Sequence, residues 1–166
     1  MQIHHRDLGL PGGSRGPEQR VQIAGSPDRI AGFPVEKRLD QFDFGFQPSI
    51  DRTVINEIAT LKFVHNAENV VFLGPPGVGK THLSIGIGIA AAQAGFRVHF
   101  ANASALVEDL SKADGERKLE EKIRGLAKFQ LLIVDEMGYL PFDDHGAHCF
   151  FQLISPAFRI NGLNAH

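Results

Sequence analysis

Apolar residues in the middle of the chain follow two alternating kinds of pattern. Short segments rich in apolar residues have the length of buried strands, and they cover 69–73, 97–101 and 131–134, of which the last is apolar throughout. Other segments carry apolar residues every three or four positions, as on one face of a helix. These predicted helices are 51–65 with Ser49 as N-cap, a helix from Ser104 to a break at 113–115, another around 119–126, and 144–158. A further helix is predicted over 81–94 from its context and not from this spacing. The alternation predicts an α/β fold with a parallel sheet.

A phosphate-binding motif lies between the first strand and the helix that follows it. The motif is Gly74-Pro75-Pro76-Gly77-Val78-Gly79-Lys80-Thr81, a complete G-x-x-x-x-G-K-[ST] loop. Glycines let backbone N–H groups surround a phosphate, and the N-terminus of the helix adds attraction for anions. We expect Lys80 to reach the β- and γ-phosphates and the Thr81 hydroxyl to bind Mg²⁺. The alternative, a merely glycine-rich turn, does not account for the strand and helix on either side.

The helix after this loop has an unusual sequence. Ile85-Gly86-Ile87-Gly88-Ile89 alternates with a period of two, which is typical of a strand, and each interior glycine costs a helix about 1 kcal/mol relative to alanine. The phosphate loop requires a helix here, so we predict one, with the small residues allowing close packing on the sheet. His82 adjoins the loop and is grouped with the cofactor-binding residues, although packing on the helix explains it more simply than ligation.

A second acidic element follows the third strand. Asp135 and Glu136 come directly after Leu131-Leu132-Ile133-Val134. An Asp at the carboxyl end of a buried strand can hold Mg²⁺ opposite Thr81, and the following Glu can act as the catalytic base that polarises water. Solvated charges at a strand end are the alternative. This doublet favours hydrolysis, and the absence of an Asn-Lys-x-Asp guanine-binding motif favours ATP over GTP.

The N-terminal quarter divides into a tail and a linker. Residues 1–28 are rich in Gly, Pro, Arg and Gln without sustained periodicity, which predicts a poorly ordered tail; a DNA-binding arm is the alternative. Residues 29–50 carry Phe42, Phe44 and Phe46 alternating with other residues. We interpret this linker as lying beside the nucleotide site, either as additional core or as a wall of the adenine pocket.

Composition limits the remaining possibilities. The chain has 166 residues, a net charge of −2 and 43% hydrophobic residues, which fits one globular domain without a global basic field for nucleic acid. It has one cysteine, no apolar run of the roughly 18 residues that cross a bilayer, and no signal peptide. These features predict a cytoplasmic protein that does not enter membranes.

Two charged stretches have ordinary interpretations. The run from Asp143 to Cys149 contains His145 and His148 and is similar to a metal cluster, but we interpret it as a helix start capped by Asp143 or Asp144. Cys149 has no evident base partner and is expected to be an inert, packed thiol. The alternating charges of 116–124 are interpreted as a solvated helical face, with DNA contact as the alternative.

Several segments together resemble one family, the IstB-like transposition helpers, which are AAA+ ATPases related to the DnaC helicase loader. The segments that carry the resemblance are Ala31-Gly32-Phe33-Pro34, Phe42-Asp43-Phe44, 47–51, 68–82, Asp135-Glu136-Met137-Gly138-Tyr139-Leu140-Pro141 and 151–155. Of these, Gly-Tyr-Leu-Pro after the acidic doublet is the most specific. The resemblance covers about three quarters of the chain, from about Ala31 to Ser155.

The resemblance implies a P-loop NTPase fold of the AAA+ type, a three-layer sandwich with a parallel sheet. It implies ATP and Mg²⁺ as cofactors, with Gly74 to Thr81 binding the nucleotide, Asp135 in the metal shell and Glu136 as the base. It also implies a homo-oligomer that acts on DNA and helps an insertion-sequence transposase. A nucleotide-binding module without turnover, or a non-functional remnant of such a gene, is the alternative.

The resemblance weakens at both ends, which predicts a chain truncated at both ends. We expect 51–158 to be a partial AAA+ core and 159–166 a frayed terminus, without the sensor strand, the arginine finger and the C-terminal sensor region. In the implied strand order 5-1-4-3-2, the missing fourth strand separates the strands that bear the loop and the acidic doublet. Each buried backbone group left unsatisfied costs about 1–3 kcal/mol, so this loss predicts either an unstable domain or direct pairing of the two strands.

Overall fold

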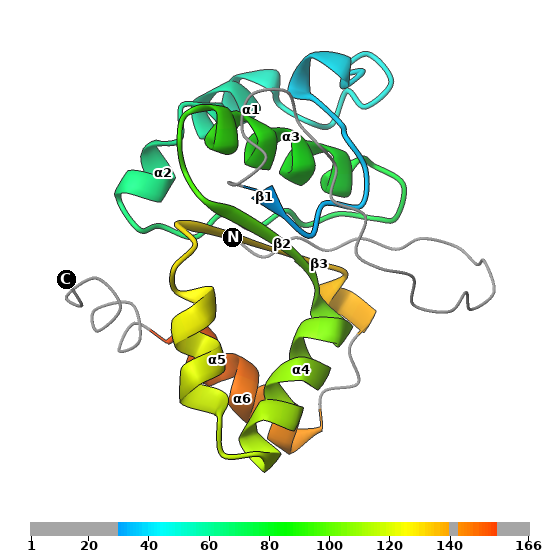
Figure 1. The fold of residues 1–166 in the computed structure, drawn as a ribbon. Coiled ribbons are helices and arrows are strands. Elements are labelled where there is room, and N and C mark those ends of the chain that lie inside the picture. The colour runs from blue at the N-terminus through cyan, green and yellow to red at the C-terminus, as the bar shows by residue number, and fades with distance from the viewer. Residues whose placement is uncertain (1–29, 140–142, 156–166) are drawn as a thin grey trace.

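A parallel sheet between two layers of helices forms the structure (Figure 1). The computed structural model describes residues 30–139 and 143–155. The sheet has the order β1 (Ile30–Ala31), β2 (Val98–Asn102) and β3 (Leu131–Asp135). One layer contains α1 (Arg52–Ala59), α2 (Lys62–His65) and α3 (Lys80–Gln93), and the other contains α4 (Ala103–Gly115), α5 (Leu119–Leu126) and α6 (Asp144–Ile154). The predicted α/β class and its three layers are therefore confirmed.

Strands β2 and β3 bring two polar residues to one edge of the sheet. They pair in parallel, with Val98 opposite Leu131 at one end and Asn102 opposite Asp135 at the other. Both strands were predicted within one residue of their observed bounds. Because the carboxyl ends of parallel strands share an edge, Asn102 and Asp135 both lie where ligands bind in open α/β sheets.

The segment 69–73 is not the buried strand that its apolar run predicts. Among the described residues the sheet contains β1, β2 and β3, and Phe72 forms only an isolated bridge outside it. The side chains of Val71 and Leu73 are 44% and 75% exposed, whereas Val70 and Phe72 pack against the core. Among the described residues no strand lies between the segment 69–73 and β3, and 69–73 does not pair with β3 directly. The segment therefore lacks the partner that a buried strand needs in the described part of the chain.

Strand β1 at the other edge was not predicted. Ile30 and Ala31 pair in parallel with Val98 and His99, which adds a two-residue strand beside β2. Two residues are too few to show periodicity, so the sequence analysis assigned Ile30 and Ala31 to the linker 29–50. The chain then continues to Phe33, which is 2% exposed and belongs to the core between the sheet and α3.

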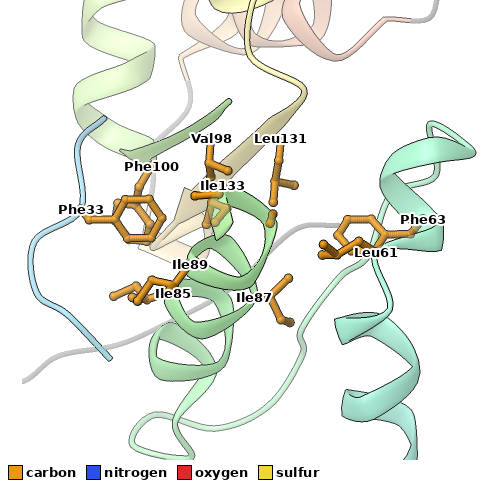
Figure 2. Packing of buried hydrophobic residues seen from close by; sticks show 12 residues of the cluster. Phe33, Leu61, Phe63, Ile85, Ile87, Ile89, Val98, Phe100, Leu131 and Ile133 are labelled. Atoms are coloured by element: carbon orange, nitrogen blue, oxygen red, sulfur yellow. The ribbon is translucent and has the colours of Figure 1, made fainter. Parts of the chain in front are cut away.

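Helix α3 is mostly apolar, and ten of its fourteen residues are buried. It packs against β2 and β3 on one face and against α1 and the short 3-10 helix η1 (Leu39–Gln41) on others. Ile85, Ile87 and Ile89 are at most 2% exposed and meet the apolar side chains of the sheet and of α2 (Figure 2). A helix that is hydrophobic all round is expected to be a buried one. The prediction of a helix here, against its local pattern, is confirmed.

The two interior glycines of α3 allow this close packing. A methyl group at Gly88 would lie 2.6 Å from Phe33 Cζ and 2.7 Å from Ile133 Cδ1, and one at Gly86 would lie 2.8 Å from Leu39 Cδ2. Real Cβ atoms essentially never come closer than 3.0 Å to such neighbours. The predicted role of the small residues is therefore confirmed, and it explains why two poor helix formers occupy a helix.

Helix boundaries differ from the predictions where polar caps compete. The predicted helix 51–65 is interrupted at Leu61, whose φ of 62° turns its side chain into the core at 6% exposure and separates α1 from α2. Asp51, not Ser49, caps α1 by accepting a hydrogen bond from the Thr53 N–H at 2.7 Å. Asn102, not Ser104, caps α4. Ser49 lies two residues before the actual cap of α1, and Ser104 lies inside the first turn of α4, so neither occupies the position directly before its helix.

Some predictions fall outside the described residues. These are the tail 1–28, the Leu140-Pro141 part of the family motif and the terminus 159–166. The helix predicted over 144–158 ends instead at Ile154, where the extended Ser155 is the C-cap. Among the described residues, no helix has the length and apolar character needed to cross a bilayer.

The packing of α3 predicts opposite effects of alanine at two helical glycines. Gly88→Ala should lower the free energy of unfolding by about 1–2 kcal/mol, because overpacking against two buried side chains exceeds the gain in helix propensity. Gly125→Ala in α5 is the control, since a methyl group there meets no atom within 4 Å. It should be neutral or stabilising by up to about 1 kcal/mol. Urea unfolding of both variants measures this, and equal effects would contradict the packing.

Candidate functional site

The phosphate loop turns directly into the N-terminus of α3. Gly77 and Gly79 have φ angles of 79° and 86°, in the left-handed region that favours glycine, and α3 begins at Lys80. The loop residues 74–77 are exposed, whereas Lys80 is 3% exposed. The loop thus presents its backbone to solvent next to the positive end of a helix, which is the arrangement that binds anions.

Lys80 folds back onto its own loop. Its Nζ donates hydrogen bonds to the carbonyl oxygens of Gly74 at 2.8 Å and Pro75 at 2.7 Å. Burial lowers the pKa of Lys80 below its ordinary value, and the charge of Asp135 opposes part of that shift. The cation is therefore in an environment that favours a further negative charge. A phosphate group would supply one.

Thr81 and Asp135 meet although 54 residues separate them. The Thr81 hydroxyl donates a hydrogen bond to Asp135 Oδ2 at 3.0 Å, and Asp135 is 5% exposed. One side chain lies in the first turn of α3 and the other at the carboxyl end of β3. A hydroxyl and a carboxylate in contact are oxygen donors of the kind that Mg²⁺ prefers. These two residues fit a magnesium site.

Glu136 leaves the sheet in a strained backbone conformation and contacts Asn102. Its φ is 63°, a left-handed conformation that costs a non-glycine residue about 1–3 kcal/mol. The Glu136 carboxylate accepts a hydrogen bond from Asn102 Nδ2. The side-chain oxygen of Asn102, Oδ1, caps α4 by accepting hydrogen bonds from the N–H groups of Ser104 and Ala105. The side chain of Asn102 thus joins the start of α4 to the residue after β3.

Asn102 is the site residue that the sequence prediction missed. The prediction ended β2 one residue earlier and assigned the cap of α4 to Ser104. The signal was present, because an Asn between a predicted strand and a predicted helix is a strong N-cap, and the carboxyl ends of β2 and β3 had to lie together.

Phe42 covers the loop on the side of η1. A methyl group at Gly79 would lie 2.5 Å from Phe42 Cε2, so the ring lies directly on the loop backbone. The Phe42 and His82 rings meet edge-on, with centroids 5.3 Å apart, and His82 Nε2 hydrogen-bonds with the Arg38 carbonyl oxygen at 2.8 Å. His82 thus packs against the linker that precedes α1.

The acidic and histidine-rich start of α6 behaves only partly as predicted. Asp143 caps the helix by accepting from the Gly146 N–H at 2.7 Å, as expected. The expectation that Cys149 has no base partner is wrong, because His145 Nε2 lies 3.8 Å from its sulfur atom. Residues four apart on a helix share a face, so this contact follows from the spacing.

Comparison with known proteins finds one family. The family model of the IstB-like ATP binding protein matches residues 19–161, which extends beyond the predicted resemblance at both ends. The insertion sequence IS5376 putative ATP-binding protein of Geobacillus stearothermophilus is 48% identical over 131 residues, 79% of this chain and 52% of that protein. The IS21 putative ATP-binding protein of Pseudomonas aeruginosa is 47% identical over 145 residues, 87% of this chain and 52% of that protein. The chain spans about half the length of these relatives.

Proposed function

Because the chain belongs to the family of IstB-like ATP-binding proteins, we propose that it binds ATP at residues 74–81 and hydrolyses it. The contact between Thr81 and Asp135 carries the proposal most directly. A glycine-rich loop alone is compatible with other anions. A loop whose threonine touches a buried carboxylate from a distant strand provides in addition the oxygen ligands that a nucleotide–magnesium complex requires.

Each polar residue of the site has a distinct role in this proposal. The backbone N–H groups of the loop and the Lys80 ammonium bind the β- and γ-phosphates. Thr81 and Asp135 hold Mg²⁺, which when bound neutralises charge on the phosphate oxygens. Glu136 orients and polarises the attacking water and accepts its proton. Glu136 directly follows Asp135, is half-buried, and contacts Asn102 at the end of β2.

The partners of the proposed function come from the relatives. Their names place them in insertion sequences. We propose that the full-length protein assembles as a homo-oligomer in the cytoplasm and assists a transposase on DNA. Since this chain spans about half the length of those relatives, that action belongs to the whole protein and not to the described residues alone.

A second function, ATP binding without turnover, is favoured by one contact. Asn102 Nδ2 donates a hydrogen bond to Oε2 of Glu136, which holds the carboxylate toward the end of β2 and occupies one of its acceptor positions in this conformation. In that case the chain would act as a nucleotide-dependent binding module.

Two substitutions separate these functions. Lys80→Ala should weaken binding of ATP with Mg²⁺ about 10- to 100-fold in calorimetry, because a charged hydrogen bond is worth about 1.5–3 kcal/mol. Lys128→Ala, at an exposed lysine, is the control and should bind normally. Glu136→Gln should retain binding and lower phosphate release by about 10²- to 10⁴-fold.

Unchanged ATP binding in Lys80→Ala would contradict the site. Saturable binding by the parent chain with no phosphate release, and no further loss in Glu136→Gln, would support the binding module instead of the ATPase.

We further propose that Phe42 forms a wall of the adenine pocket. Its ring lies on Gly79 at the end of the phosphate loop and against His82 in the first turn of α3. An aromatic face there offers the base a stacking surface next to the phosphates.

The linker provides a matched control for this proposal. Phe42→Ala should weaken ATP binding about 5- to 10-fold, as expected for the loss of one aromatic contact, and leave binding of inorganic tripolyphosphate unchanged. Phe46→Ala, at a side chain that is 78% exposed, should change neither. If Phe42→Ala weakened both ligands equally, the ring would support only the loop and not the base.

A further inference from the structure

A cluster of three metal-ligating side chains lies on the far side of the sheet from α3. It consists of Asp114 near the end of α4 and His145 and Cys149 on α6. His145 Nε2 lies 2.9 Å from Asp114 Oδ2 and 3.8 Å from Cys149 Sγ, and the three ligand atoms all lie within 4.8 Å of one another. None of these three residues belongs to the proposed ATP site.

The chemistry of the cluster argues against a nucleophilic cysteine. Cys149 is 0% exposed, so a substrate cannot reach its sulfur atom. Burial raises the pKa of the Cys149 thiol, and the negative charges of Asp114 and Asp143 raise it further, although a hydrogen bond with Ser111 opposes them. A reactive cysteine needs the opposite, an exposed thiolate in a positive environment.

The same surroundings suit a cation. We propose that Asp114, His145 and Cys149 form a binding site for a divalent transition metal of the zinc class. Sulfur, imidazole nitrogen and carboxylate oxygen are the three ligand types that Zn²⁺ takes in proteins. With bonds of about 2.0–2.3 Å, tetrahedral ligand atoms lie about 3.3–3.8 Å apart. The nitrogen–sulfur separation of 3.8 Å falls at the top of this range, and the nitrogen–oxygen separation of 2.9 Å is slightly below it. On binding, the thiol loses its proton to solvent, and the two negative ligands balance the charge of the ion.

The fold supports the site with two packed helices. Helices α4 and α6 contact each other along the apolar cluster beneath β3, and Cys149, Leu106 and Leu110 belong to it. Asp114 and His145 are about half-exposed, so solvent reaches two of the three ligands, and water can complete the coordination as a fourth ligand. A bound metal would fasten the end of α4 to the first turns of α6.

Titration of the purified, reduced, metal-free chain with Co²⁺ and Zn²⁺ tests the proposal. Co²⁺ should bind one equivalent and give a sulfur-to-cobalt charge-transfer band, because a thiolate is a ligand. Zn²⁺ in about 100-fold excess over its dissociation constant should raise the thermal midpoint by several degrees. His145→Ala, at an exposed side chain, should reduce the affinity at least about tenfold, and Cys149→Ser should lose the band.

His148→Ala is the matched control. His148 lies on the same helix, is exposed and hydrogen-bonds with Gln152 instead of the cluster, so this variant should bind both metals as the parent does. The absence of a charge-transfer band in the parent would overturn the proposal, because binding through other histidines gives none. Equal metal affinity in His145→Ala and the parent would overturn it as well, even if Cys149→Ser fails to fold.

Discussion

The candidate site depends on how closely α3 packs on the sheet. The space for this contact comes from Gly88, where a methyl group would collide with Phe33 and Ile133. With the helix at that distance, its first turn reaches the carboxyl end of β3, and Thr81 contacts Asp135. The usual route to this geometry is a continuous sheet that contains both strands. Here the segment before the loop lies outside the described sheet. The position of Thr81 relative to Asp135 therefore depends on the contacts that α3 itself makes with β2 and β3.

The side chain of Asn102 joins the opposite layer to the site. Asn102 caps α4 with its oxygen atom and binds Glu136 with its nitrogen atom. A change in the position of Glu136 therefore changes a contact with the first residue before α4, and α4 in turn packs along α6. The left-handed φ of Glu136 is a local cost that this contact helps to offset. The nucleotide site and the α4–α6 pair are thus physically connected, and the cluster at Asp114 lies at the other end of that pair.

The sequence predicted the structure correctly where a motif required one particular local conformation. The loop had to precede a helix, so α3 was predicted despite its alternating isoleucines, and Asp135 had to lie at a strand end near Thr81. Prediction failed where the outcome depended on residues far along the chain. The run 69–73 had strand propensity, but a strand needs a partner, and the described residues provide none beside β3. Strand β1 is too short to show periodicity. The neighbour of His145 and Cys149 is Asp114 on another helix, which spacing within α6 cannot reveal.

A double-mutant cycle on Thr81 and Asp135 tests the central claim, that α3 packing brings the two halves of the site into contact before any nucleotide binds. The free energy of unfolding is measured without nucleotide for the parent, Thr81→Val, Asp135→Asn and the double variant. The hydrogen bond between them predicts a coupling of about 0.5–3 kcal/mol. Effects that add within about 0.3–0.5 kcal/mol would show that the residues do not interact, and would contradict the account.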